Sequence, residues 1–370
     1  SRLRNLRRLL CFGDAQKAAS HHLPGTAVCG GPMRSLLKHP AEWRTLAFMA
    51  IFVACSRTLW RCDAALAAAG PAGWLLLLLL WFTLCFFSAI AAVITHNALH
   101  VPAFNYAAPQ LALQCLLTVA YGQPVSVYLP VHNRSHHRHT GTRADLMRPQ
   151  KMPHRWNALN LFTAHLYSPG TGAGVRFLVR FVRAQWGVGK RLVLTWALEA
   201  SALLFTLAVG FRASWWRGLL YMYVPQMCSQ WFINMINFVQ HDGCEVDPAH
   251  RGVNFARNFT GSWFNFFTLN NGYHTMHHLK PGLHWSVLPA HHARTVKPHI
   301  APSLDVPDFT RFFWRRMWVR DDYLGNPVPP FHHEDDEIVD FATAESFMDD
   351  VSVIPSVRRR RSCSPARKKD

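Results

Sequence analysis

The apolar residues of this chain are concentrated in a few long runs. The clearest run extends from Trp74 to Thr95 and has no charged residue among its 22 positions. At a rise of about 1.5 Å per residue, a helix of this length can cross a hydrocarbon core of about 30 Å. Similar runs cover residues 45–60, 192–211 and 218–240, and none of them carries more than one charged residue. The pattern therefore predicts four membrane-spanning helices, at about 45–60, 74–95, 192–211 and 218–240.

The distances between the runs predict how the helices pair. Residues 61–73 separate the first two runs, and residues 212–217 separate the last two. Connections this short join antiparallel neighbours, so we expect two helical hairpins. Glu199 is the one carboxylate inside the third run, where a functional role and a hydrogen bond to a neighbouring helix are equally open interpretations.

Composition and charge agree with a membrane protein. Hydrophobic residues make up 50% of the chain and charged residues only 16%, against about 25% charged residues in an average soluble protein. The formal net charge is +18, and most of the positive side chains flank the apolar runs. By the positive-inside rule, the N-terminus, residues 130–191 and the region after residue 240 lie in the cytosol. We therefore attribute the charge to membrane lipids and expect no nucleic-acid partner. The nine cysteines include no CxxC pair, so they indicate neither a disulfide framework nor a cysteine metal site.

The histidines form three short clusters beside the apolar runs. The clusters read HNALH, HNRSHH and HTMHH, and a ninth histidine directly follows the fourth run. The nine residues are His96, His100, His132, His136, His137, His241, His274, His277 and His278. Imidazole is the most common protein metal ligand, and nine imidazoles are too many for one metal ion but about right for two. On a helix, histidines three or four positions apart share a face, whereas adjacent ones point about 100° apart, so one cluster can contribute to two metal sites.

The histidine clusters also constrain the topology. Residues 107–129 are apolar enough for a fifth span, but one more crossing would put the first two clusters on opposite faces of the membrane. Because this stretch also contains Gly122 and Pro124, we expect an interfacial or re-entrant segment. The expected fold is an all-α integral membrane protein, in which two transmembrane helical hairpins support a cytosolic helical cap that carries the histidine clusters.

Two other classes of histidine-rich membrane protein fit less well. A zinc-dependent hydrolase needs an open metal position and a nearby glutamate base, and the chain contains no HExxH motif. A transporter would place its metal-binding or proton-binding histidines inside the spans, whereas these histidines stand at the ends of the spans. The clusters therefore favour a metal-dependent enzyme.

The order HxxxH, HxxxHH and HxxHH resembles the histidine boxes of the membrane fatty acid desaturase superfamily, over roughly residues 45–300. The sequences around the boxes, HNRSHHRHT and NNGYH, are similar as well. The family's further ligand pair, Asn-x-x-x-His before the last box, matches Asn237 and His241. The resemblance implies a non-haem centre of two iron ions held by the nine histidines, with Asn237 acting through a water.

The resemblance also implies an activity. Such a protein is a dioxygen-dependent desaturase that introduces a double bond into the acyl chain of a fatty acyl lipid or an acyl-CoA. Hydroxylases and carotenoid or alkane oxygenases share the scaffold and are the alternative. No catalytic side chain is expected beyond the metal ligands. The protein would be an integral, multi-pass membrane protein with its site at the cytosolic or stromal face, in the endoplasmic reticulum, a plastid or a bacterial inner membrane.

The chain departs from some members of that superfamily. Its first box has three residues between the histidines, where animal acyl-CoA desaturases have four, and it lacks the glutamate that alkane hydroxylases place beside the early histidines. The chain has no HPGG signature of a fused b-type cytochrome. The expected electron donor is therefore a separate protein, either a ferredoxin or a b-type cytochrome with its reductase. His139 and His284 flank the boxes, and we expect them to support the ligands rather than to bind metal.

The two ends of the chain differ from its centre. Residues 1–44 mix arginine with glycine, proline and alanine, which predicts a basic segment that is a targeting peptide or disordered. Residues 311–370 turn acidic and then basic, which predicts a C-terminal extension that is largely a disordered tail. The membrane domain is expected to cover residues 45–310.

Overall fold

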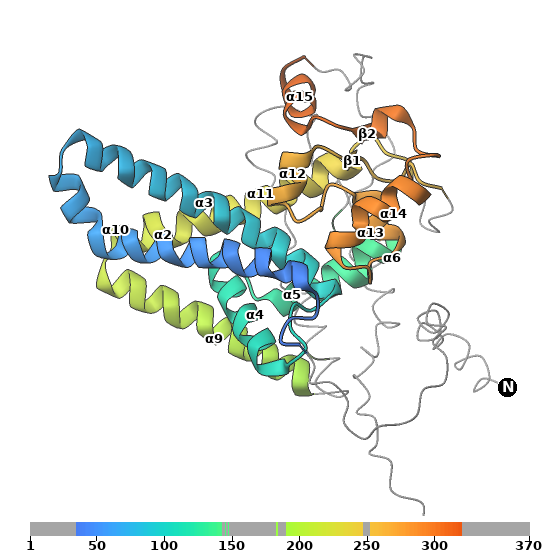
Figure 1. Ribbon diagram of the computed structural model, residues 1–370. Helices are drawn as coiled ribbons and strands as arrows, with labels where there is room; N and C mark the ends of the chain where they lie inside the picture. The colour runs from blue at the N-terminus through green and yellow to red at the C-terminus, as the bar shows by residue number, and fades with distance from the viewer. Residues whose placement is uncertain are drawn as a thin grey trace, which may run out of the picture. The chain divides into compact units, whose positions relative to one another are not determined.

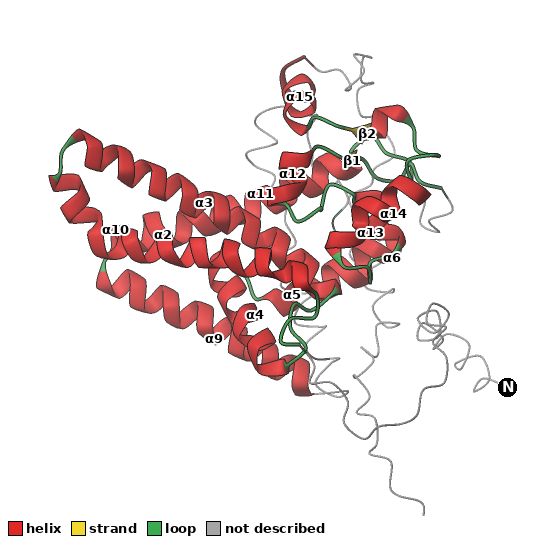
Figure 2. Ribbon diagram, viewed as in Figure 1, coloured by secondary structure: helices red, strands yellow, loops and turns green. Residues whose placement is uncertain are grey.

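The computed structural model describes residues 35–142, Asp145, Met147, Arg183, 190–246 and 252–319. The predictions for the basic N-terminal segment, for most of the connector between the second and third runs, and for the C-terminal tail fall largely outside these residues. The described chain is mainly helical (Figures 1 and 2).

Four long helices correspond to the four apolar runs: α2 (Trp43–Ala68), α3 (Pro71–His100), α9 (Lys190–Ala213) and α11 (Val224–His241). Helix α3 packs against both α2 and α11 (Figure 1). Three segments are long and apolar enough to cross a membrane, namely Pro40–Ala68, Pro71–His100 and Leu192–Ala213. Helix α11 has 18 residues and follows α10 (Trp215–Gly218) and the π-helical segment η6 (Leu219–Tyr223). The fourth span therefore stays a prediction.

The turns of both hairpins are shorter than the sequence pattern predicted. Helix α2 continues to Ala68 and α3 begins at Pro71, so the predicted turn over residues 61–73 is wrong. Residues 61–68 are rich in alanine, the strongest helix former, and Gly70 makes the turn with a left-handed φ of 79°. Proline at the first helical position then starts α3. In the second hairpin only Ser214 separates α9 from α10.

A partly buried ion pair joins the two hairpins near their turns. The guanidinium of Arg217 donates from Nε to Asp63 Oδ2 at 2.8 Å and from a terminal nitrogen to Oδ1 at 2.6 Å. The hydroxyl of Tyr221 lies 3.3 Å from the same carboxylate. Two-point pairing of this kind fixes the geometry as well as the charge, so it sets the register of one hairpin against the other.

The apolar stretch 107–129 forms α4 (Ala107–Tyr121) and α5 (Val125–Leu129). The 15 residues of α4 extend about 22 Å, which is shorter than a hydrocarbon core. An interfacial or re-entrant position remains a prediction. The buried Glu199 of α9 accepts hydrogen bonds from the backbone N–H of Ser126 at 2.9 Å and from its hydroxyl at 2.6 Å. These contacts connect α9 to α5, the helix that leads into the second histidine cluster.

A largely apolar cavity of about 280 Å³ lies between α2, α4, α9 and η6. Its aromatic lining comes from Phe52, Trp60 and Tyr221. The cavity therefore belongs to the part of the molecule that contains the long apolar helices.

The residues after α11 form a cap of short elements. Its helices are α12 (Ser262–Phe267), α13 (His274–Leu279), α14 (Leu288–Thr295) and α15 (Phe309–Trp314), with the short segments η7 (Trp285–Val287), η8 (Pro302–Leu304) and η9 (Arg315–Val319). A two-residue parallel pairing of β1 (Asn258–Phe259) with β2 (Asp305–Val306) is an exception to the all-α expectation.

The cap is tied to the start of the first long helix. Glu42, at the end of η2 (Pro40–Glu42), is 3% exposed and accepts from His284 Nε2 at 2.8 Å and from Trp285 Nε1 at 3.2 Å. His284 also stacks on His39 with ring centroids 4.1 Å apart. The contacts of His284 thus hold the cap to η2, which differs from the expectation that it supports a metal ligand.

Candidate metal centre

The nine predicted histidines meet in one buried region. Four of them, His96, His100, His132 and His277, have ligand atoms within 4.8 Å of one another, and we call them the first group. The second group consists of His136, His241, His274 and His278, with the same limit. All eight side chains are buried except that of His100, which is half-buried. Residues from four separate parts of the sequence therefore form two adjacent four-imidazole sites.

Ring nitrogens of the first group and of His137 have more close neighbours than hydrogen bonding can satisfy. His277 Nε2 lies 2.9 Å from His96 Nε2 and 3.1 Å from His137 Nε2. His137 Nε2 lies 3.0 Å from His132 Nε2. A neutral imidazole nitrogen offers either one hydrogen or one lone pair, so a nitrogen with two such neighbours cannot be paired with both. Nitrogens that share a metal ion at about 2.1 Å lie about 3 Å apart, and this spacing fits the observed distances.

The second group shows the same arrangement. His274 Nε2 lies 2.9 Å from His241 Nε2 and 3.1 Å from His278 Nε2. His136 Nε2 is buried and has no hydrogen-bond partner among the described residues. Four ring nitrogens that lie within 4.8 Å of one another and cannot all be paired are suited to bind a cation.

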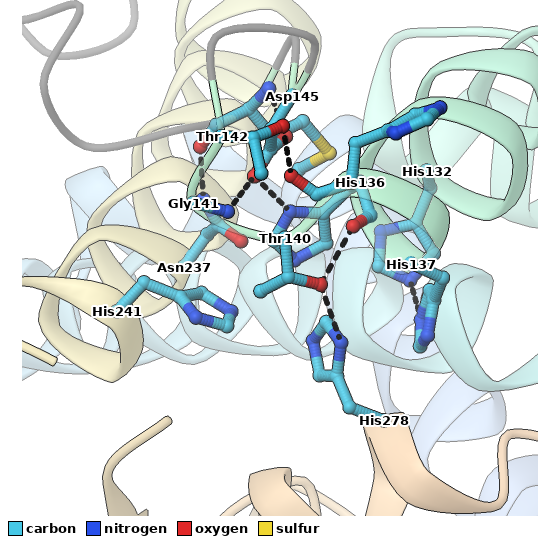
Figure 3. Close-up of polar contacts among 12 residues, drawn as sticks. His132, His136, His137, Thr140, Gly141, Thr142, Asp145, Asn237, His241 and His278 are labelled. Carbon is cyan, nitrogen blue, oxygen red and sulfur yellow. Dashed lines mark hydrogen bonds and ion pairs between the residues drawn. The ribbon is translucent and has the colours of Figure 1, made fainter. Parts of the chain in front are cut away.

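His137 stands between the two groups. Its Nε2 approaches the first group, as described above, while its ring stacks on His278 of the second group, with centroids 4.2 Å apart and planes 24° apart. Figure 3 shows His137 between His132 and His278. The chain thus has one more imidazole than the two groups need, at a position where it can serve either.

A π-helix explains how the second cluster divides between the groups. Residues Pro130–His136 form the π-helical segment η3, which continues into α6 (His137–His139). In a π-helix the hydrogen bonds join residues five apart, so His132 and His137 come to the same side. The predicted i, i+4 pair, His132 and His136, is instead split between the first and second groups.

The other two clusters follow from ordinary α-helices. Helix α3 has 30 residues and extends about 45 Å, longer than a hydrocarbon core, and its last turns carry His96 and His100. Helix α13 begins at His274. Its i, i+4 pair, His274 and His278, belongs to the second group, and His277 belongs to the first. The adjacent residues His277 and His278 thus belong to different groups, as the sequence pattern predicts for one cluster that contributes to two sites.

A close backbone approach positions α13. A Cβ atom on Gly272, two residues before His274, would lie 2.0 Å from the carbonyl oxygen of Phe259 and 2.6 Å from Asn265 Oδ1. The backbone N–H of Phe259 in turn donates to the carbonyl of Gly272 at 2.8 Å. Only glycine allows the last box to lie this close to β1.

We predict that Gly272→Ala lowers the thermal midpoint of unfolding and the amount of metal bound per folded chain, because the added methyl group displaces the start of α13. A core overpacking of this kind costs about 1–3 kcal/mol. Gly282→Ala is the matched control, since a Cβ there meets nothing within 4 Å. Equal melting temperatures for the two variants would contradict the assigned role of Gly272.

Three of the four imidazoles in the second group have their Nδ1 atom close to an oxygen atom of the protein. His136 Nδ1 lies 2.9 Å from Asp145 Oδ2, His241 Nδ1 lies 3.2 Å from the carbonyl of Phe255, and His278 Nδ1 lies 3.2 Å from Thr140 Oγ1. Figure 3 shows Asp145 and Thr140 beside these rings. Such contacts orient metal-binding imidazoles and fix their tautomer. The sequence analysis did not identify Asp145 as a site residue, although it is the one acidic residue within the basic connector 130–191.

Burial keeps the imidazoles in the state that binds metal. It lowers the pKa of His132, His137, His274, His277 and His278 well below the ordinary histidine value, and the charge of neighbouring imidazoles lowers each pKa further. Burial alone would raise the pKa of Asp145, but His136 and two backbone N–H donors lower it to about 2. At neutral pH these five imidazoles are therefore neutral, and Asp145 is a carboxylate anion.

Asn237 lies one helical turn before His241 on α11. Its side-chain amide donates to the carbonyl of Met147 at 2.7 Å, which places it beside the Asp145 segment (Figure 3). Its role as a ligand acting through a water remains a prediction, as does the supporting role of His139.

The donor set suits a transition metal. All eight grouped ligand atoms are imidazole nitrogens, which suit iron, zinc or copper, whereas magnesium and calcium prefer oxygen ligands. The paired groups leave room for two ions rather than one.

The chain matches a known protein family. The model of the family described as fatty acid desaturase matches residues 72–312. The matched region includes all nine histidines and Asn237. No curated protein is similar enough to the chain to be counted as a match.

Proposed function

Because the chain belongs to the fatty acid desaturase family, we propose that it is a membrane fatty acyl desaturase with a centre of two iron ions. The family makes it a histidine-box, oxygen-dependent oxidoreductase. The observation that carries the finer proposal is the pair of adjacent four-imidazole groups. One group alone would suit a single structural metal ion, whereas two groups side by side suit chemistry that needs two redox metals.

In this proposal the first group holds one iron ion and the second group holds the other. His137 completes either coordination sphere, and Asn237 contributes through a water. When bound, the two iron ions supply an oxidant made from dioxygen that is strong enough to remove hydrogen from an unactivated methylene, which no side chain can do.

The protein residues have three tasks in this reaction. The five imidazoles whose pKa is lowered by burial are neutral at neutral pH, so each keeps one lone pair that can bind metal. Helices α3, α11, α13 and the π-helix hold the nitrogens in a fixed geometry. Burial keeps bulk water away from a reactive centre.

The overall reaction balances with an external electron source. Two adjacent methylene groups lose two hydrogen atoms and become an alkene, and dioxygen takes up these two hydrogens, two protons and two electrons to form two waters. The two electrons come from a separate protein, a ferredoxin or a b-type cytochrome with its reductase. The substrate is a fatty acyl lipid or an acyl-CoA.

We place the protein in the membrane with four spans, including α11, and with the site at the cytosolic or stromal face. The three candidate spanning helices and the family support a membrane protein. Support for the side comes from the charge pattern, because the N-terminal segment and the connector 130–191 are rich in lysine and arginine. All four segments that supply histidines would then meet at one membrane surface.

The proposal predicts a new lipid product. Expression in a host of simple lipid composition, followed by mass spectrometry of the total fatty acids, should reveal chains with one more double bond. The His277→Ala variant, expressed at the same level, is the control. New hydroxyl groups in place of double bonds would favour a hydroxylase on the same scaffold, and an unchanged profile in the presence of an electron donor would contradict the proposal.

A further inference from the structure

The two histidine groups differ in how the protein supports them. Asp145 is fully buried, with 0% exposure, and all three of its close partners are donors. Oδ2 accepts from His136 Nδ1 at 2.9 Å and from the backbone N–H of Gly141 at 3.0 Å, while Oδ1 accepts from the backbone N–H of Met147 at 2.7 Å. These three hydrogen bonds therefore fix the position of the carboxylate without a metal ion.

The contact with Asp145 determines which nitrogen of His136 is available. Since the carboxylate accepts the hydrogen on Nδ1, the lone pair lies on Nε2. His136 Nε2 is buried, lacks a partner among the described residues and belongs to the second group. A carboxylate partner also makes the imidazole a stronger electron donor to a metal ion.

Two further hydrogen bonds orient imidazoles of the second group in the same way. The hydroxyl of Thr140 donates to the carbonyl of His136 at 2.7 Å, so its oxygen is free to accept from His278 Nδ1 at 3.2 Å. The carbonyl of Phe255 accepts from His241 Nδ1 at 3.2 Å. In three of the four imidazoles of this group, the Nδ1 atom is thus hydrogen-bonded to an oxygen atom of the protein.

The first group lacks comparable support. Within the described part of the chain, no carboxylate pairs with its imidazoles. His132 Nδ1 is buried without a hydrogen-bond partner there. His100 is also the one half-buried member of the eight.

We propose that Asp145 is a positioning residue which, through His136, makes the second group the tighter of two unequal metal sites. The first group then loses its ion more readily. This inference rests on the proposed function, because it assumes that both groups bind iron.

Metal release from the purified, iron-loaded full-length protein tests the proposal. Anaerobic competition with a chromophoric ferrous chelator should show two phases in the wild-type protein, one for each site. Asp145→Asn keeps the shape of the side chain but replaces one acceptor oxygen with a donor. Because loss of such a partner typically costs 10–100-fold in metal affinity, the slow phase should become faster by about that factor, with the fast phase unchanged.

Further variants separate a positioning role of Asp145 from a general structural role. In a His136→Ala background, adding Asp145→Asn should cause no further change in iron release, because residues that act through one another are not additive. Glu42→Gln breaks a different buried carboxylate–imidazole pair, in which Glu42 lies 2.8 Å from His284, and should leave both release phases of the folded protein unchanged. Asp145→Glu keeps the charge and should release iron at a rate between those of the wild-type and Asp145→Asn proteins. This variant still tests the inference if the Asn variant yields too little protein.

The outcomes are distinct. Identical release from wild-type and Asp145→Asn protein, or equal effects of Asp145→Asn and Glu42→Gln, would overturn the inference while leaving the di-iron proposal intact. A single release phase in the wild-type protein would also overturn it. A folded wild-type protein that binds no iron would instead contradict the proposed function.

Discussion

Replacing His277 with alanine should abolish activity and lower the iron content of the protein while leaving its insertion in the membrane intact. His277 Nε2 lies between His96 and His137, at 2.9 and 3.1 Å, so its removal takes away the ligand that connects α13 to α3. Loss of residues that merely support ligands costs about 10–100-fold, and loss of a ligand should therefore cost more than about 100-fold. The measurement is product formation per folded chain, with iron determined on the same sample.

His299→Ala is the matched control for this variant. His299 lies in the same cap but is exposed and belongs to neither group, so its removal should leave activity and iron content unchanged. Membrane extraction of both variants should match that of the wild-type protein, because α2, α3 and α9 are untouched. Wild-type turnover by the His277→Ala protein would disprove the site assignment.

Removing the metal should strongly destabilise the cap. Eight converging imidazole nitrogens, at least two of them without a hydrogen-bond partner in the described structure, are a costly arrangement when no cation satisfies them. A ligand present at 1,000 times its dissociation constant stabilises the folded state by about 4 kcal/mol, and two ions should contribute at least that much. We therefore expect a chelator to lower the melting temperature by several degrees and to eliminate activity.

Addition of metal to the stripped protein tests the same prediction. Ferrous iron should restore both the melting temperature and activity. Zinc should restore the melting temperature alone, because it binds imidazole but has no redox chemistry. A melting temperature that does not respond to chelation and reloading would contradict the conclusion that the two groups are metal sites.

The long apolar helices and the nine histidines could be predicted from the sequence because both depend on local periodicity. A run such as Trp74–Thr95 has a single stable conformation in a membrane, and histidines at i, i+4 share a helix face wherever the helix is regular. The family resemblance was confirmed by the match over residues 72–312.

The features that the sequence did not predict depend on contacts between distant residues. The π-helix at Pro130–His136 assigns His132 and His136 to different groups, and no local pattern separates a π-helix from an α-helix. Asp145 is nine residues from His136 along the chain, and only the folded connector brings them to 2.9 Å. The helical extension to Ala68 was missed because the apolar run ends at residue 60, and a run of apolar residues does not show that a charged residue such as Asp63 stays in the helix and pairs with Arg217.

The most direct test of the central claim is the iron content of the purified active protein. Elemental analysis of a preparation that forms product in a dioxygen-dependent assay should give about two iron atoms per chain, and activity should scale with that ratio across partly loaded samples. Full activity in a preparation with iron near zero would contradict the di-iron account.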